Sequence, residues 1–290
     1  MKPTNKPMAR RQAEPPARIQ WEVSMSLGSV VVTGAGDGIG HAIAVRLAAD
    51  GWNVVGLEIN PETASDLGKK LGKGHGCLCG DASDRAVLKK AREAAEKLAP
   101  LRGWVNNVGI ALMGNLHEPK DADVERVFAV NLMSHFWGSS EAIQTWVRHR
   151  VAGSIVNVSS VHGRSAFNMW AAYDVAKAGI DALTRYIAVE YGPVGIRANA
   201  VAPGAVRTSL VQRVIRDSPD STRAEREMSI QHPLERIGEP EEIAAAVSWL
   251  ISSEASFVTG QSLAVDGGLT SRCYRYEPDA ALLERYGKVS

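Results

Sequence analysis

Short apolar runs rich in β-branched residues alternate with longer amphipathic stretches from Ser29 onward. The runs predict buried strands at 29–34, 53–58, 75–81, 101–107, 153–160, 195–204 and 260–268. The longer stretches predict helices at 38–51, 61–72, 83–99, 121–150, 171–191 and 239–252. Strands and helices that alternate at this spacing form a parallel sheet with helices on both faces. The pattern therefore predicts an α/β fold with one doubly wound parallel sheet of about seven strands.

The domain organisation is predicted from where this alternation begins and ends. It covers 28–270 of the 290 residues without an internal repeat or a low-complexity linker, which favours one domain over two. Residues 1–27 contain four prolines and lack the apolar segment of a secretory signal, so we predict a disordered N-terminal extension or an added leader. Residues 271–290 contain three tyrosines and two leucines, which suggest a tail that docks at a subunit interface; the alternative is a frayed terminus.

Charge, hydropathy and cysteine content indicate which partners and which compartment to expect. Lys plus Arg is 33 against 32 for Asp plus Glu, a net charge of +1, which gives no reason to expect nucleic acid. No apolar run approaches the roughly 18–20 residues that span a membrane. Three cysteines are too few for a disulfide scaffold and fit a reducing compartment. We therefore expect a cytoplasmic protein without nucleic-acid or membrane partners, and the scattered histidines predict no catalytic metal.

A glycine-rich turn, TGAGDGIG at 33–40, joins the first predicted strand to the first predicted helix. Gly34, Gly38 and Gly40 permit a tight turn, let a pyrophosphate approach the backbone, and let the helix pack close to the sheet. The amino end of that helix would then face the negative charge. Glu58 ends the second predicted strand, where a carboxylate can accept hydrogen bonds from a ribose hydroxyl; the alternative is a carboxylate in solvent.

Tyr173 and Lys177 are four positions apart in the predicted helix at 171–191, so they share one face. An interfacial tyrosine beside a solvated lysine is the simpler interpretation of this pair. A free phenol is a poor base near neutral pH, because its pKa is about 10. An ammonium about 4 Å away, at an effective dielectric constant of about 20, is worth on the order of 4 kcal/mol. We therefore expect Lys177 to lower the pKa of Tyr173, at most to about 7.

Eight short motifs resemble, in the same order, those of the short-chain dehydrogenase/reductase family. They are TGxxxGIG at 33–40, GDAS at 80–83, NNVG at 106–109, VNLMSHF at 130–136, IVNVSS at 155–160, YDVAK at 173–177, VAPGAVRT at 201–208 and VTGQSLAVDGG at 258–268. The resemblance covers about 28–270 and implies a Rossmann-type sheet with NAD(P)-dependent chemistry. Val108 departs from the family, which usually has alanine there; the change adds methyl groups near the cofactor and removes no functional group.

The resemblance implies four catalytic residues. Tyr173 would be the general acid/base, and Lys177 would also hold the hydroxyls of the nicotinamide ribose. Ser160 would stabilise negative charge on the reacting oxygen; its neighbour Ser159 faces the other side of the strand, so only one hydroxyl is expected in the site. Asn131 would hold a helix distortion and a water that leads to Lys177. The alternative for Asn131 is a side chain inside a helix that bonds to a carbonyl.

The resemblance also implies the residues that bind the cofactor. Asp81 and Ala82 would border the adenine, and the chain at Pro203 and Gly204 would run beside the nicotinamide. The full set is Gly34, Gly36, Asp37, Gly38, Ile39, Gly40, Glu58, Asp81, Ala82, Asn107, Val108, Gly109, Tyr173, Lys177, Pro203, Gly204, Val206 and Thr208. NAD is favoured over NADP, because Glu58 would repel a 2′-phosphate.

The predicted function is hydride transfer between NAD(H) and a secondary alcohol or ketone. The alternatives are an NADPH-dependent 3-oxoacyl or other ketone reductase, and a dinucleotide-binding protein without turnover. The helices at 121–150 and 171–191 correspond to interface helices of the family, so a homotetramer is expected.

The substrate is the least specified part of this prediction. His162, together with Ser160 and Tyr173, is a candidate substrate contact; a loop side chain in solvent is an equal interpretation of His162. The segment 205–236 mixes charged and apolar residues and suits a lid that orders on binding. A small polyol, sugar or hydroxyacid is the favoured substrate class.

Overall fold

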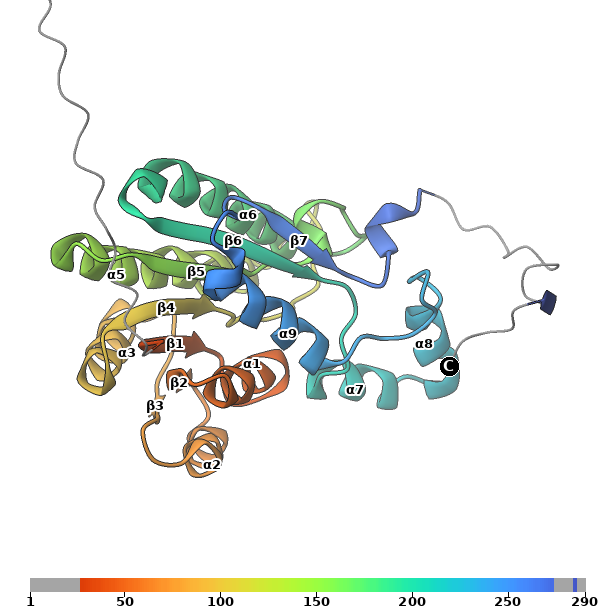
Figure 1. Cartoon of the computed structure of the whole chain (residues 1–290). Coiled ribbons are helices and arrows are strands. Elements are labelled where there is room, and N and C mark those ends of the chain that lie inside the picture. The colour runs from red at the N-terminus through yellow and green to blue at the C-terminus, as the bar shows by residue number, and fades with distance from the viewer. Residues whose placement is uncertain (1–26, 274–283, 286–290) are drawn as a thin grey trace, which may run out of the picture.

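The computed structural model describes residues 27–273, 284 and 285, and its centre is one parallel sheet between two layers of helices (Figure 1). The strands are β1 (Ser29–Thr33), β2 (Asn53–Glu58), β3 (Gly76–Cys79), β4 (Leu101–Asn106), β5 (Gly153–Val158), β6 (Ile196–Pro203) and β7 (Ser262–Val265). Their order across the sheet is β3-β2-β1-β4-β5-β6-β7, and every neighbouring pair is parallel. The predicted α/β sheet is confirmed. The predicted N-terminal extension and most of the predicted tail lie outside the described residues.

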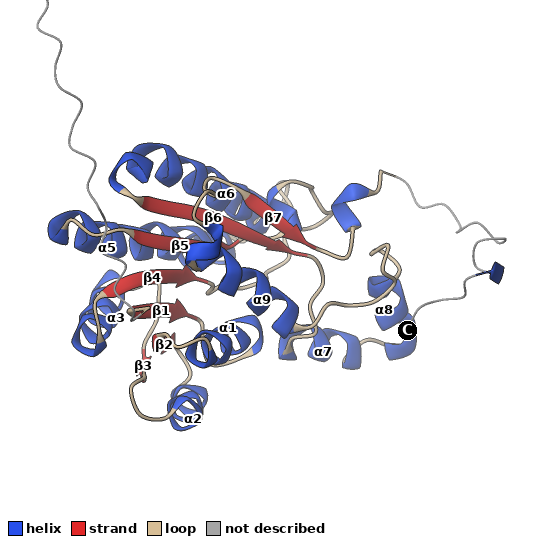
Figure 2. Ribbon diagram, viewed as in Figure 1, coloured by secondary structure: helices blue, strands red, loops and turns tan. Residues whose placement is uncertain are grey.

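Different helices cover the two faces of the sheet (Figure 2). The helices of the described residues are α1 (Gly38–Ala49), α2 (Pro61–Leu71), α3 (Arg85–Leu98), α4 (Asp121–Val127), α5 (Ser134–His149), α6 (Ala171–Tyr191), α7 (Ser209–Arg216), α8 (Ser221–Ser229) and α9 (Pro240–Ile251). Val30 and Val32 of β1 belong to the core beneath α1, α2 and α9. Val31 points the other way, into the core that α3, α5 and α6 cover. Because both faces are covered, all of β1 is buried.

The order of the strands determines where a site can form. The chain moves from β1 to β2 and β3 on one side, and then crosses to β4 and continues through β5, β6 and β7 on the other. The carboxyl ends of all seven strands meet at one edge of this sheet. Ligands of such folds bind at that edge, next to the point where the strand order reverses.

The helix predicted at 121–150 is wrong as one regular helix. After α4, a π-helical turn occupies Phe128–Met133, and α5 follows it. The apolar pattern runs through the turn without a break, so periodicity alone could not locate it. The helix predicted at 171–191 is confirmed as α6.

Two helices occupy the segment 205–236, for which the sequence analysis predicted no helix. Thr208 caps α7 by accepting a hydrogen bond from the backbone of Val211 at 3.3 Å. Asp220 caps α8 by accepting from Arg223 at 2.9 Å. Both helices are short, at eight and nine residues, and α8 is mostly polar, so the apolar pattern did not predict them.

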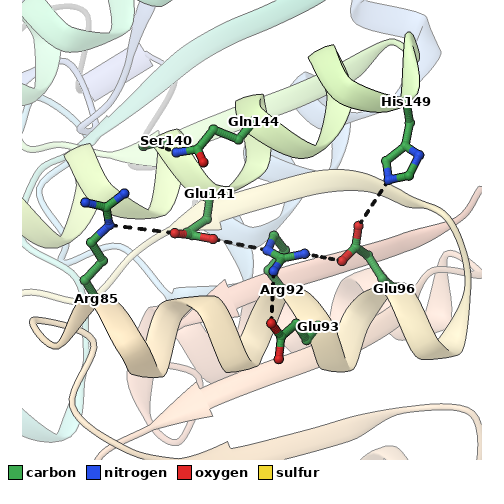
Figure 3. Close-up of polar contacts among 8 residues, drawn as sticks. All are labelled: Arg85, Arg92, Glu93, Glu96, Ser140, Glu141, Gln144 and His149. Carbon is green, nitrogen blue, oxygen red and sulfur yellow. Dashed lines mark hydrogen bonds and ion pairs between the residues drawn. The ribbon is translucent and has the colours of Figure 1, made fainter.

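Arg92 of α3 is the centre of a group of ion pairs between α3 and α5 (Figure 3). Its guanidinium donates to Glu141 of α5 at 3.1 Å, to Glu93 at 3.1 Å, and to Glu96. Arg85 lies 3.8 Å from the other oxygen of Glu141. The side chains of Arg92 and Glu141 are only 11% and 9% exposed, so little water reaches the pair. Removing one partner of such a pair costs more than removing both.

We predict that Glu141→Leu lowers the free energy of unfolding by about 2–4 kcal/mol, because Arg92 loses a buried carboxylate. The double variant Arg92→Met/Glu141→Leu is expected to lose less than the sum of the two single variants. Denaturant unfolding of the four proteins measures this coupling. Glu93→Leu is the control, since its carboxylate is 46% exposed, and its effect should stay below about 1 kcal/mol. Strictly additive losses would contradict the prediction.

Candidate active site

A cavity of about 460 Å³ lies at the carboxyl ends of the strands, between α6 and the start of α7. It brings together most of the residues predicted from the sequence: Gly34, Asp37, Gly38, Ile39, Gly40, Glu58, Asp81, Ala82, Asn107, Val108, Gly109, Ser160, Tyr173, Lys177, Pro203, Gly204, Val206 and Thr208. The predicted residues Gly36, Asn131 and His162 lie outside this lining.

The cavity is also lined by residues that the sequence analysis did not select. Most are close neighbours of predicted residues: Leu57, Ile59, Gly80, Ile110, Ala111, Val158, Ser159, Ala205, Ser209, Leu210 and Val211. Arg126 and Val130 come from the α4 region. They are four positions apart, so helical spacing would have placed them on one face shortly before the predicted Asn131.

The glycine-rich turn is packed so closely that it excludes side chains. A Cβ atom on Gly40 would lie 1.9 Å from the carbonyl oxygen of Gly34, so α1 begins directly against the turn. Asp37 caps α1 by accepting from the backbone of Gly38 at 2.7 Å, and it also accepts from Ser209 Oγ of α7. The first turn of a helix has amide groups without partners inside the helix. This close, amide-rich cradle fits the pyrophosphate of the predicted dinucleotide.

The Glu58 carboxylate is fixed beside this turn. One oxygen accepts from the backbone of Gly36 at 2.9 Å, and the other accepts from the backbone of Asn60 at 3.0 Å. Each oxygen keeps a further lone pair for a hydroxyl donor. In the described chain, Arg126 and Lys177 are the only Lys or Arg residues that line the cavity, and both donate to other acceptors.

Arg126 fixes the acidic side chain that follows β3. It donates to Asp81 at 2.9 Å and to Ser83 Oγ at 3.0 Å. Asp81 also accepts from the backbone and hydroxyl of Ser83, at 2.8 and 2.7 Å. Burial acts to raise the pKa of Asp81, but the hydrogen bonds from Ser83 and Arg126 outweigh it and hold the pKa below its usual value. Asp81 is therefore an ionised and oriented acceptor.

Tyr173, Ser160 and Lys177 meet at the end of β5. The Ser160 side chain is hydrogen-bonded to the Tyr173 phenol and accepts from the backbone of His162 at 3.2 Å. Lys177 Nζ donates to the Val158 carbonyl at 2.9 Å and lies 5.5 Å from the centre of the Tyr173 ring. Ser159 also lines the cavity, but its hydroxyl donates to the Lys177 carbonyl at 3.3 Å. Of the two serine hydroxyls, that of Ser160 therefore reaches the phenol.

The expected lowering of the Tyr173 pKa is wrong for this structure. Burial raises the pKa of Tyr173 to about 12, although the hydrogen bond from Ser160 opposes the rise. Burial also lowers the pKa of Lys177 to about 8, while the Asp181 carboxylate opposes that change. A spacing of four positions in a helix shows that Tyr173 and Lys177 share one face. It does not show how far each group is removed from water. At neutral pH, Tyr173 is therefore a proton donor.

Asn131 joins the π-helical turn to the loop after β4. Its side-chain amide exchanges two hydrogen bonds of 2.8 Å with the backbone of Ile110. A Cβ atom on Gly109 would lie 3.6 Å from Asn131 Oδ1 and 3.7 Å from Lys177 Nζ, so the two side chains converge there. Asn131 thus bonds to a carbonyl, as the alternative interpretation expected. It also lies in the helix distortion that the resemblance implies.

His162 is not a loop side chain in solvent, since it is 17% exposed and packed beside Tyr173. Its Nδ1 lies 2.5 Å from Asp174 Oδ1. The imidazole stacks on Phe167 with 4.0 Å between ring centres, and it meets the Tyr173 ring edge-on at 5.0 Å. Burial lowers the pKa of His162, although Asp174 opposes the change. A neutral imidazole therefore supports the phenol from outside the cavity lining.

The loop after β6 closes the cavity on the side of α7. A Cβ atom on Gly38 would lie 3.0 Å from Thr208 Cγ2, so the start of α7 packs on the glycine-rich turn. Val206 forms a bridge with Gly238, which fastens the loop to the chain that precedes α9. The loop after β6 is thus held both against the glycine-rich turn and against the chain before α9.

Side chains that could ligate a metal are scattered over the described residues. No group of three or more His, Cys, Asp or Glu side chains among them is arranged to hold a metal ion. No helix in the described part of the chain is both long enough and apolar enough to cross a membrane.

Known proteins resemble the chain over most of its length. A family model described as enoyl-(acyl carrier protein) reductase matches residues 34–270. The 2-(S)-hydroxypropyl-CoM dehydrogenase 3 of Xanthobacter autotrophicus is 36% identical over 249 residues, which are 83% of this chain and 96% of that protein. The 3beta-hydroxysteroid dehydrogenase 1 of Eggerthella lenta is 36% identical over 247 residues, or 83% of this chain and 93% of that protein.

A solved structure has the same fold. The aldohexose dehydrogenase AldT of Thermoplasma acidophilum, in ligand-free form, superposes with a TM-score of 0.78 and 34% sequence identity. The superposition covers 87% of this chain and 98% of that one. The three named proteins are all dehydrogenases, and their names specify three different compounds.

Proposed function

Because the chain belongs to the short-chain dehydrogenase/reductase family, we propose that it transfers a hydride between NAD(H) and a secondary alcohol or ketone. The chain is an oxidoreductase that acts on CH–OH groups and uses a nicotinamide nucleotide. One arrangement gives the main support for hydride transfer between NAD(H) and a secondary alcohol or ketone. Tyr173 is hydrogen-bonded to Ser160 and lies beside Lys177, and Glu58 and the glycine-rich turn border the same cavity.

In the proposed mechanism, Tyr173 moves the proton. A bound nicotinamide would supply the redox chemistry: NAD would take up a hydride from an alcohol, and NADH would give one to a ketone. The Tyr173 phenol gives its proton to the substrate oxygen in reduction and takes the proton from the hydroxyl in oxidation. Ser160 Oγ donates to the same oxygen as negative charge develops there. Lys177 is charged below its pKa of about 8, and its ammonium favours the phenolate form of Tyr173. Asn131 fixes the adjoining loop after β4.

The proposed cofactor contacts follow the lining of the cavity. The turn at 34–40 would hold the pyrophosphate, and Asp81 and Ala82 would border the adenine. Residues 107–109 would line the adenosine side, and residues 203–208 would line the nicotinamide side. Lys177 would also hold the hydroxyls of the nicotinamide ribose. This assignment is supported by the close packing of the turn, which leaves backbone amides at the start of α1.

The proposed preference for NAD rests on Glu58. Its two backbone hydrogen bonds hold the carboxylate at the end of β2, where it can accept from the adenosine ribose. A 2′-phosphate at that place would meet a fixed like charge. Arg126 is paired with Asp81 and does not supply a neutralising cation. This argues against the alternative of an NADPH-dependent ketone reductase.

For the substrate, we propose a polar alcohol such as a polyol, a sugar or a hydroxyacid. His162 lies outside the cavity lining, but its ring abuts the phenol, so it is the proposed further contact for a substrate that extends past Ser160 and Tyr173. The segment 205–236 is the proposed lid. Arg207, near its start, pairs with Glu225 of α8 at 2.8 Å and with Glu239, which follows the segment.

We place the enzyme in the cytoplasm. Cys77, Cys79 and Cys273 are all free thiols. Free thiols persist in reducing compartments, so the cysteines of this chain need no oxidising environment.

We also propose a homotetramer built on two apolar surfaces. α6 leaves Val175, Tyr186 and Val189 exposed, and Phe136 of α5 is exposed as well. Phe257 is fully exposed in the connection between α9 and β7. Large apolar side chains that gather on helix faces mark association surfaces in proteins of this kind. Two such surfaces, used with two-fold symmetry, would give four subunits.

Tyr173→Phe is expected to reduce kcat by at least about a hundredfold, because the proton donor is lost while the ring remains. The dissociation constant of NADH should change by less than about threefold, since the phenol contributes to the reaction more than to binding. Steady-state kinetics and fluorescence titration measure the two effects. Tyr191→Phe, at the carboxyl end of α6, is the matched control. A Tyr173→Phe enzyme that keeps more than about a tenth of kcat would refute this role.

Wild-type enzyme is expected to show a kcat/KM for NAD at least about tenfold above that for NADP. Glu58→Gln should reduce this ratio several-fold, because the amide removes the charge and keeps an acceptor for the backbone of Gly36. Kinetics with both cofactors and one working substrate measure the ratio. Glu62→Gln, in the exposed first turn of α2, is the control. An unchanged ratio in Glu58→Gln would show that another residue selects the cofactor.

Light scattering at micromolar concentration is expected to give a mass of about four times the 31.1 kDa of the chain. Val189→Asp should dissociate the assembly, because it places a charge in the apolar surface of α6. Val214→Asp makes the same change on exposed α7 and should leave the mass unchanged. A monomeric wild-type mass would exclude the tetramer.

A further inference from the structure

The imidazole of His232 lies behind the active-site cavity and takes no part in the mechanism above. His232 follows α8 and is 2% exposed. Its Nδ1 lies 3.0 Å from the carbonyl oxygen of Met228, in the last turn of α8. Its Nε2 lies 3.1 Å from the backbone nitrogen of Ala205, in the loop after β6. The ring therefore joins the α7–α8 segment to the cavity.

These two partners determine which ring nitrogen holds the proton. A carbonyl oxygen can only accept, so Nδ1 must donate to Met228. A backbone N–H can only donate, so Nε2 must accept from Ala205. His232 is thus a neutral imidazole in one tautomer, and its acceptor nitrogen is engaged by the cavity loop. Neither asparagine nor glutamine can reproduce both contacts in the same way.

The loop rests directly on this ring. A Cβ atom on Gly204 would lie 2.6 Å from His232 Nε2, so only glycine lets the backbone come this close. The carbonyl of Ala205 accepts from the backbone of Gly238 at 2.9 Å, and Gly204 N donates to Val265 at 3.2 Å. The neighbouring polar groups of the loop are therefore bonded to the chain before α9 and to β7. The N–H of Ala205 relies on His232.

We propose that His232 is a positioning residue that holds the Gly204–Ala205 wall of the cavity in place for the nicotinamide half of the cofactor. This inference rests on the proposed function, which assigns that wall to the nicotinamide side. The adenosine half is assigned to the opposite end of the cavity, at Glu58 and Asp81. Loss of the Nε2 acceptor should therefore weaken one half of the cofactor site and leave the other half intact.

His232→Asn and His232→Gln separate the two ring contacts. The asparagine amide can replace Nδ1 and leaves Ala205 without an acceptor, whereas the longer glutamine places an oxygen near the Nε2 position. For His232→Asn, the dissociation constant of NADH should rise about tenfold, the scale expected when a buried N–H loses its acceptor. The dissociation constant of ADP-ribose, which lacks nicotinamide, should change by less than about twofold. His232→Gln should restore NADH binding to within about threefold of wild type.

The outcomes distinguish the inference from the function on which it rests. Wild-type enzyme that binds neither NADH nor ADP-ribose would refute the proposed function itself. Equal weakening of both ligands in His232→Asn, or NADH binding in His232→Gln as weak as in His232→Asn, would overturn the positioning role. Gly204→Ala tests the same contact from the other side if His232→Asn does not fold. It should also weaken NADH and spare ADP-ribose, and equal effects on both ligands would again refute the role.

Discussion

Burial of the Lys177 ammonium is the constraint to which the surrounding structure conforms. Lys177 is 3% exposed, and an unpaired cation there would cost several kcal/mol. The end of β5 supplies the Val158 carbonyl as its acceptor. The loop after β4 lies beside it, since a Cβ atom on Gly109 would be 3.7 Å from Lys177 Nζ, and Asn131 fixes that loop through Ile110. The ends of β4 and β5, which are neighbours in the sheet, and the π-helical turn thus all place groups around the buried Lys177 ammonium.

The fold followed from the sequence because its main features are periodic. Both faces of the sheet are covered, so the strands appear as continuous apolar runs, and α6 begins and ends where its pattern does. The apolar pattern did not show the π-helical turn at Phe128–Met133, because apolar residues continue through it; only the resemblance, through Asn131, implied a helix distortion there. α7 and α8 escaped prediction for a different reason: they are only eight and nine residues long, and each begins at a side-chain cap that the apolar pattern does not show.

The lining of the candidate site was largely predicted, whereas its electrostatics were not. Motifs located Tyr173, Lys177 and Ser160, which the structure brings together in one cavity. Sequence spacing cannot report how much water reaches a group, and desolvation turned the expected change of the Tyr173 pKa into its opposite. Arg126 shows a second limit. Its role depends on Asp81, which is distant in the sequence and meets it only in the folded chain.

The two faces of the sheet also differ in when they can be covered during synthesis. The core under α3, α5 and α6 draws on residues up to Ala198, so it can form before the last part of the chain leaves the ribosome. The core under α1 needs Ile243 and Leu250 of α9, and Ser248 of α9 donates to Asp50, 198 positions earlier. Contacts between such distant positions form slowly. Until α9 emerges, the part of α1 that packs on α9 remains uncovered, and a chaperone that binds nascent chains would find its target there.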